Sequence, residues 1–192
     1  MNLQQWIAAD LTSLRQRLGG FVNVVPPELW SQPVDHGGLP PLAIAWHLAR
    51  HHDVAVNAVV RRTPEVLDDW ASRVGITSDT WQGLSEAEDR DTTALLDPVS
   101  VGGYLLDVID HTLAWVTTAA VTTADLPDLD AVPDSAAALA QLGTPTDRFD
   151  WLYAMWAGKT NHFFLSWEAI GHGYNHLGEL ISLRNRLGLS PF

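Results

Sequence analysis

The chain ends in its most strongly patterned segment: Thr160 to Leu187 read TNHFFLSWEAIGHGYNHLGELISLRNRL. At about 100° per residue, the turn of an α-helix, the apolar side chains of this segment fall on two opposite faces. One face carries Phe163, Trp167, Ile170, Tyr174, Leu177 and Ile181, and the other carries Leu165, His172, His176, Leu180, Leu183 and Leu187. A helix that is apolar on both sides is usually buried on both sides, so this segment is predicted to lie in the interior of a helical protein.

Three further stretches repeat the spacing of apolar residues by threes and fours, and shorter helices are expected between them. The long helices are predicted over Leu3–Leu18, with Gly19-Gly20 as a stop, over Leu42–Arg61, and after Pro98. The short ones are predicted near Glu28–Trp30, from Thr63-Pro64 to Arg73, from Ser85, where Glu88 stands at capping-box spacing, and from Ser135 to Leu142. The last helical region is expected to start at Asp147, to break near Gly158 and to end at Gly188.

No stretch alternates apolar and polar residues over the length of a strand. The sequence therefore predicts an all-α protein, a four-helix bundle with short extra helices in connections of uneven length. Its 192 residues, 46% of them hydrophobic, suit one domain spanning residues 1–192.

Composition excludes several classes of function. With a formal net charge of −12 the chain repels phosphate backbones, so no nucleic-acid partner is expected. No apolar run approaches the roughly 20 residues of a membrane span, and the first residues lack a secretory signal pattern, so we expect no membrane partner and a cytoplasmic location. Cysteine is absent, which excludes disulfides and thiolate metal ligands. Nine tryptophans and eight histidines remain to be explained.

The second apolar face of the last helix contains a pair of histidines with metal-binding spacing. His172 and His176 are four residues apart, so their rings project from the same side of the helix and can bind one ion together. The intervening residues differ from the HExxH protease motif. Glu168 and Glu179 flank the pair, and either can orient a histidine or act as an acid or base. The neighbouring glycines (Gly171, Gly173 and Gly178) indicate either a close approach to the backbone or tight helix packing.

A catalytic divalent metal needs a third protein ligand, and the second long helix offers two candidates. His47 and His51 are again four residues apart, in the run Trp46-His47-Leu48-Ala49-Arg50-His51-His52-Asp53. His111 is interpreted as a hydrogen-bonded core residue, and His36 and His162 as incidental. Trp46 is a candidate for lining an apolar substrate pocket, and Arg184 for pairing with a substrate carboxylate.

These motifs together resemble the DinB-like superfamily, which includes the mycothiol- and bacillithiol-dependent enzymes. The resemblance is carried by a loop with Gly37-Gly38-Leu39-Pro40, a helix reading Ala-Trp-His47-Leu-Ala, and a last helix reading His172-x-x-x-His176-x-Gly-Glu-x-x-x-x-Arg184-x-x-x-Gly188. It implies a bundle with up-down-down-up topology and a zinc or nickel ion held by His47, His172 and His176, with His51 as an alternate ligand from the second helix.

Three functions follow from these residues and the resemblance. The first is a metal-dependent transferase or isomerase that activates a low-molecular-weight thiol such as mycothiol against a small electrophile. The second is metal-assisted hydrolysis, which uses the same ligands with bound water as nucleophile. The third is a metal-stabilised binding protein without catalytic activity. A homodimer is expected, since many proteins of the superfamily are dimers.

Overall fold

The computed structural model describes residues 2–34, 38–76, 82–85, 93–122 and 127–190. Within these ranges the regular structure is helical throughout and contains no strand. The prediction of an all-α protein is therefore confirmed for the part of the chain that is described.

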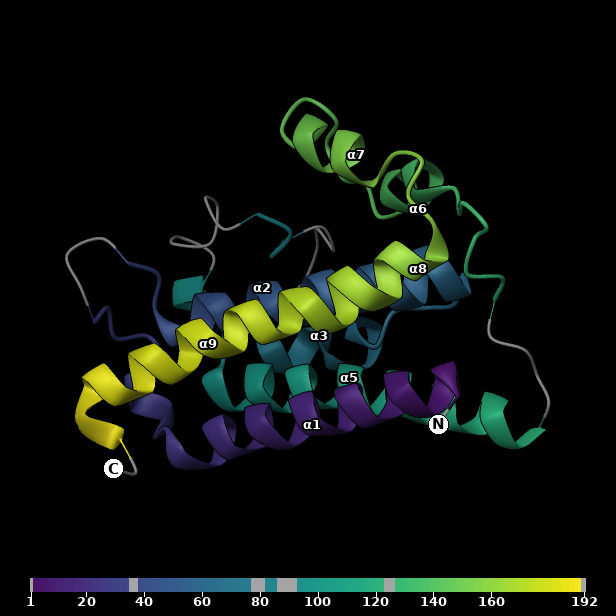
Figure 1. The fold of residues 1–192 in the computed structure, drawn as a ribbon. Helices are drawn as coiled ribbons and strands as arrows, with labels where there is room; N and C mark the ends of the chain where they lie inside the picture. Colours follow the sequence, from purple (N-terminus) through teal and green to yellow (C-terminus); the bar gives the residue numbers. More distant parts are fainter. Residues whose placement is uncertain (1, 35–37, 77–81, 86–92, 123–126, 191–192) are drawn as a thin grey trace.

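Four long helical runs lie side by side (Figure 1). They are α1 (Leu3–Val24), α2 (Pro41–Asp53, continued by a π-helical segment over Val54–Arg61), α5 (Pro98–Thr122) and α9 (His172–Arg184). The helix of α9 begins earlier in the chain, with α8 (Asn161–Phe163) and a π-helical segment over Phe164–Gly171, and continues through Asn185–Leu189. Helix α1 packs against α5 and α9, and α2 packs against the same two helices. Each long helix thus buries side chains against two neighbours.

Shorter helices occupy the connections. A 3-10 turn (Pro27–Leu29) precedes α2, α3 (Leu67–Val74) packs on α5, and a further 3-10 turn (Thr93–Leu95) precedes α5. Helices α6 (Ser135–Gln141) and α7 (Asp150–Trp156) pack on each other and lie together outside the four long helices, above α8 in the view of Figure 1. The short helices expected near residues 28–30, 64–73 and 135–142 are confirmed within a few residues. The capping box proposed at Ser85 and Glu88 lies partly outside the described residues.

The predicted stop of the first helix at Gly19-Gly20 is wrong, because α1 continues to Val24. The physical reason is burial beyond the glycines. The ring of Phe21 is 1% exposed and packs 5.4 Å from the ring of Trp30, and Val25 is also buried. This apolar contact offsets the roughly 1 kcal/mol that each helical glycine costs. The predicted break near Gly158 and the predicted end at Gly188 are confirmed. These two glycines have φ of 68° and 79°, respectively, which an α-helix does not contain.

The π-helical segment before α9 also changes which side chains face the core. Its wider i→i+5 turns shift the register away from that of an ideal α-helix. Trp167, assigned to the core face by the sequence pattern, is 42% exposed, whereas its neighbour Phe164 is fully buried. The other apolar face is well buried over Leu180 and Leu183.

A buried polar network ties α2 to α5 and to the segment before α3. The guanidinium of Arg50, which is fully buried, donates to the Glu65 carboxylate at 2.8 Å and to the Tyr104 hydroxyl at 3.0 Å. Tyr104 in turn donates to Asp53 at 2.7 Å, and Asp53 also accepts from the backbone amides of Val66 and Leu67. These bonds satisfy charges that would otherwise oppose burial, and they fix α2, which carries His47.

Candidate metal centre

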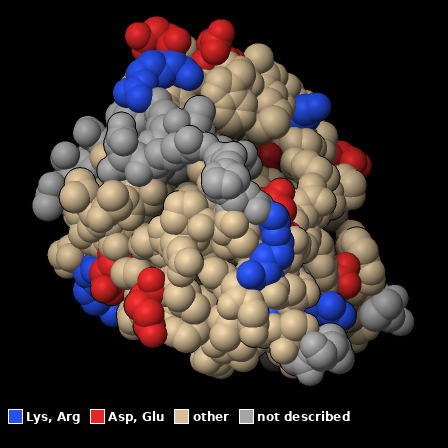
Figure 2. All heavy atoms as spheres, turned by 90° about the vertical axis from the view of Figure 1, so that its left-hand side faces the viewer, with Lys and Arg blue, Asp and Glu red and all other residues tan. Residues whose placement is uncertain are grey.

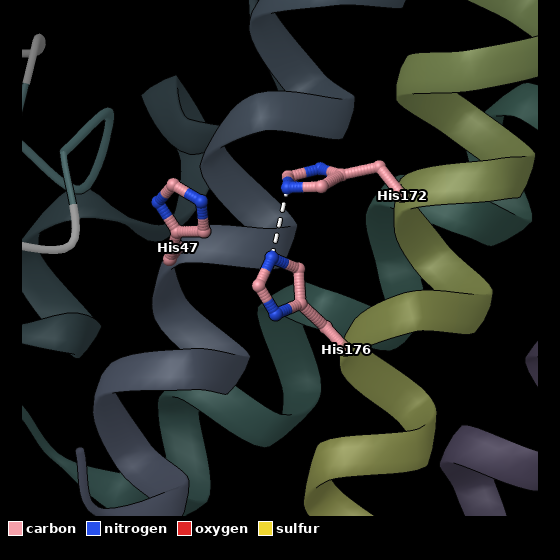
Figure 3. A group of neighbouring side chains, drawn as sticks. All are labelled: His47, His172 and His176. Carbon is pink, nitrogen blue, oxygen red and sulfur yellow. Dashed lines mark hydrogen bonds between the residues drawn. The ribbon is translucent and has the colours of Figure 1, made fainter. Parts of the chain in front are cut away.

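Three histidines from distant parts of the sequence meet between α2 and α9. Figure 3 shows the ring of His47, from α2, facing the rings of His172 and His176, from α9. The ring of His47 lies 5.3 Å from that of His172 and 5.1 Å from that of His176, measured between centroids. One side-chain nitrogen from each of the three lies within 4.8 Å of the other two. The structure therefore brings the three predicted ligands together.

Hydrogen bonds from Nδ1 set the tautomer of His47 and of His176. Nδ1 of His47 donates to the backbone carbonyl of Gly83 at 2.8 Å, and Nδ1 of His176 donates to the carboxylate of Glu179 at 2.9 Å. With the proton on Nδ1, each ring carries its lone pair on Nε2. A carbonyl or carboxylate behind a ligand histidine is the usual arrangement in metal sites. Glu179 therefore lies where an outer partner of a metal ligand is expected.

The close approach of two ring nitrogens fits a bound cation. Nε2 of His172 and Nε2 of His176 lie 2.8 Å apart (Figure 3). Two lone pairs at this distance repel each other unless a proton or a metal ion lies between them. Two nitrogens bound to one tetrahedral zinc at 2.0–2.1 Å stand about 3.3 Å apart, so a small adjustment of the rings accommodates the ion. The residues present thus suit a divalent metal with nitrogen ligands.

Burial keeps the imidazoles of His47 and His172 in the form that binds metal. Burial, reinforced by the neighbouring rings of His51, His172 and His176, lowers the pKa of His47 well below its ordinary value of 6.5. Burial and the neighbouring histidines lower the pKa of His172 to about 2. Both rings are therefore neutral at pH 7, and a neutral ring nitrogen is required for coordination.

A second group of potential ligands shares His172 with the first. His51, Glu168 and His172 also present one ligand atom each within 4.8 Å of one another. Nδ1 of His51 lies 3.1 Å from Oε2 of Glu168, and Nε2 of His51 donates to the carbonyl of Leu84 at 3.0 Å. The Glu168 side chain is 1% exposed, and its Oε1 accepts from the indole of Trp156 at 2.8 Å. The alternate ligand His51 therefore lies beside the three histidines, and its own partners are Glu168 and the Leu84 carbonyl.

The backbone of residues 82–84 supports two of the three histidines of α2. The carbonyls of Gln82, Gly83 and Leu84 accept from Arg50, His47 and His51, respectively. Gly83 has φ of 87°, and a Cβ there would lie 2.5 Å from the indole nitrogen of Trp46. From the sequence, the polar stretch of residues 75–97 was interpreted as a surface loop, with a lid or a partner surface as the alternative; part of it lies outside the described residues. The support of His47 and His51 by backbone carbonyls was missed, because a carbonyl leaves no signal in the sequence.

A cavity of about 350 Å³ opens beside the histidines. Its lining consists of His47, His51, Ser85, Trp151, Met155, Trp167, Glu168 and His172. Trp151 and Trp167 are 41% and 42% exposed. Sequence reasoning missed Trp151 and Met155, because α7 is short and nothing in its pattern indicates where it packs. The histidine-rich site thus has an aromatic wall from α7 and from the π-helical segment.

The two residues proposed for substrate binding lie elsewhere. Trp46 is fully buried, with its ring 5.7 Å from that of Tyr104, and it does not line this cavity. Arg184 lies in the last turn of α9 and donates to the side chain of its neighbour Asn185. The interpretation of His111 as a core residue is wrong: its side chain is 52% exposed, 3.8 Å from Asp107 of the same helix.

The glycines around the histidine pair have different environments. A Cβ on Gly173 would lie 2.5 Å from a methyl group of Leu14 in α1, whereas a Cβ on Gly178 would meet nothing within 4 Å. At Gly171 the nearest atom belongs to Trp167 of the same helix. Of the two explanations for these glycines, tight helix packing is supported at Gly173.

Comparison with known proteins supplies no family: no protein-family model matches the chain, and no curated protein matches it at a significant level. Among the described residues, no helix combines the length and the apolar composition needed to cross a membrane. On the face shown in Figure 2, basic side chains lie beside acidic ones in small groups and do not form one continuous basic patch.

Proposed function

We propose that the chain is a metal-dependent enzyme in which His47, His172 and His176 hold a divalent zinc or nickel ion. The observation that carries the proposal is the 2.8 Å approach of the two Nε2 atoms of α9, opposite a histidine whose tautomer is set by a backbone carbonyl. Imidazole nitrogens are usual ligands of such ions.

The proposed reaction joins a low-molecular-weight thiol, such as mycothiol, to a small electrophile. A divalent ion held by His47, His172 and His176 would supply a Lewis acid that lowers the pKa of a bound thiol. In a transfer, the sulfur forms a bond to the electrophilic carbon, the leaving group departs with the bonding electrons, and the thiol proton is released to solvent. In an isomerisation, the thiol adds and is later expelled unchanged.

The lining of the cavity favours an uncharged, flat electrophile as the substrate. Trp151, Met155 and Trp167 offer apolar surface beside His47 and His172, and the described lining contains no lysine or arginine. Indole faces bind planar apolar groups by stacking and by exclusion of water. Glu179 keeps the ring of His176 in place through the 2.9 Å hydrogen bond to its Nδ1.

We also propose membership of the DinB-like superfamily with its four-helix bundle of up-down-down-up topology. The directions of the long helices in Figure 1 support this topology: α1 and α9 run one way, while α2 and α5 run the other. The positions of the three histidines, one on α2 and two on α9, agree with the ligand set that the resemblance implies. A homodimer is proposed on the same resemblance, and sedimentation at several protein concentrations tests it.

The thiol mechanism is tested by following consumption of a chromogenic electrophile by metal-loaded protein, with and without mycothiol. We expect turnover only when thiol and metal are both present, and loss of that turnover in His172→Ala. His111→Ala, an exposed histidine outside the site, is the matched control. Turnover without thiol favours metal-assisted hydrolysis, and turnover retained after metal removal contradicts the proposal.

A further inference from the structure

We propose that the site holds a second metal ion, bound by His51, Glu168 and Nδ1 of His172, so that the ring of His172 bridges the two ions. This inference rests on the proposed function, because His172 is also a ligand of the first ion. It assigns to Glu168 and His51 a role as metal ligands in place of an acid, a base or an alternate ligand.

The ring of His51 lies between the Leu84 carbonyl and the Glu168 carboxylate. Its Nε2 donates to the carbonyl of Leu84 at 3.0 Å, so in the neutral ring the lone pair lies on Nδ1. That lone pair faces Oε2 of Glu168 at 3.1 Å. Two acceptors in a buried setting attract each other only through a cation between them, either a proton or a metal ion.

The environment of Nδ1 of His172 favours a metal ion over a proton at this place. Nδ1 of His172 is buried and has no hydrogen-bond partner among the described residues; Oε2 of Glu168 lies 3.9 Å from it. A proton shared by His51 and Glu168 leaves this nitrogen unsatisfied, and unsatisfied buried polar atoms are rare in folded proteins. A metal ion among the three atoms satisfies all of them at once.

The carboxylate of Glu168 is held in position by a buried hydrogen bond. Oε1 of Glu168 accepts from the indole of Trp156 at 2.8 Å, and both side chains are almost fully buried. This bond holds the carboxylate so that Oε2 faces the two histidines. Two imidazoles and one carboxylate form a ligand set that is common in catalytic zinc and iron sites, and preorganised ligands of this kind favour metal binding.

The residues of the second group are reached from the cavity beside the histidines. All three ligands of the second group line the 350 Å³ cavity, whereas His176 of the first group does not. The second ion therefore has an entry path and room for a substrate or water ligand. Binding of that ion would release the proton of Nδ1 of His172 to solvent. Nε2 of the same ring faces Nε2 of His176 and would stay available to the first ion.

The inference is tested by metal titration of the full chain after exhaustive removal of metal with a chelator. Zn²⁺ and, separately, Cu²⁺ are added, and bound ions per chain are counted after gel filtration. We expect two ions per chain in the parent and one in Glu168→Gln, a variant that retains an oxygen acceptor for Trp156. The exposed Glu28→Gln is the matched control and keeps two.

Cu²⁺ gives a second readout that does not depend on activity. Two Cu²⁺ ions bridged by one imidazole ring couple magnetically. The electron paramagnetic resonance signal that appears with the first equivalent of Cu²⁺ is therefore expected to weaken when the second equivalent binds. In Glu168→Gln and in His51→Ala the signal stays that of a single ion. One ion per chain in the parent, or two in Glu168→Gln, overturns the inference but leaves the proposed three-histidine site intact. No bound ion in the parent contradicts that site as well.

Discussion

His52 is the buried histidine of α2 whose ring contacts α5, where its Nε2 donates to the hydroxyl of Thr112 at 2.9 Å. Burial lowers the pKa of His52 to about 3. The unfolded chain gains a proton here below pH 6.5, while the folded chain stays neutral until about pH 3. The free energy of unfolding therefore falls as the pH drops through this window, by about 1.4 kcal/mol per pH unit.

This prediction is checked by urea unfolding of metal-free protein at pH 7 and pH 5. His52→Gln removes the titrating group and keeps a donor for Thr112. Between these pH values we expect the variant to lose about 2 kcal/mol less stability than the parent, as the linkage relation requires for one such histidine. Equal losses in the two proteins contradict the assignment of a neutral, buried ring to His52.

Gly83 supports the proposed metal ligand His47 through its carbonyl oxygen. A Cβ at this position meets the side chains of Trp46 and Arg50 at 2.5 Å, and the positive φ disfavours any residue with a side chain. Gly83→Ala is therefore expected to displace the carbonyl and to weaken metal binding by about 10- to 100-fold, the usual effect of losing an outer partner.

Gly143→Ala is the matched control for this prediction, because Gly143 also has a positive φ but a Cβ there meets nothing within 4 Å. Calorimetric titration with Zn²⁺ compares the two variants. Equal affinities in Gly83→Ala and the parent contradict a supporting role for the carbonyl.

The contact between α1 and α9 depends on the absence of a side chain at Gly173. Gly173→Ala places a methyl group 2.5 Å from Leu14 and is expected to lower the free energy of unfolding by about 1–3 kcal/mol. Gly178→Ala meets open space on the same helix and is expected to raise it by up to about 1 kcal/mol, the helix preference of alanine over glycine. Urea unfolding of both variants measures the difference, and destabilisation of equal size in the two contradicts the packing explanation.

The long helices were predictable from their apolar spacing, but their ends and registers were less so. The pattern before Gly19 could not reveal that Phe21 is buried against Trp30, a contact with a residue outside the helix. Likewise, a wheel drawn for an ideal α-helix cannot include the π-helical turns over Phe164–Gly171, so Trp167 was placed in the core. Both errors come from tertiary packing, which local spacing does not record.

Across the whole molecule, the buried network around Arg50 is expected to contribute more to stability than any ion pair on the surface. Arg50→Met leaves Glu65 and Asp53 without their buried cation, a change that typically costs about 3–5 kcal/mol. Arg15→Met breaks the partly exposed pair with Asp110 and is expected to cost less than about 1 kcal/mol. Thermal and urea unfolding compare the two variants. Similar losses of unfolding free energy in both would contradict a larger contribution of the buried network to stability.

Some residues of the site were predictable from the sequence, and others were not. His172 and His176 were found from helical spacing, and His47 was assigned through the family resemblance. Spacing within one helix cannot show which segments lie nearby in space, so the carbonyls of residues 82–84 and the wall formed by Trp151 and Met155 of α7 were missed. The pairing of Glu168 with His51 and Trp156 was also beyond reach, because it joins three separate stretches of the chain.

The central claim is that three imidazoles from α2 and α9 converge to bind a divalent ion, and metal content tests it most directly. Protein purified without a histidine tag is loaded with Zn²⁺, dialysed and analysed for bound metal. We compare the parent with the His47→Ala, His172→Ala, His176→Ala triple variant, and use the exposed His111→Ala, His162→Ala double variant as control. We expect at least one tightly bound ion per chain in the parent and the control and almost none in the triple variant. A parent without metal, or a triple variant that retains it, contradicts the account.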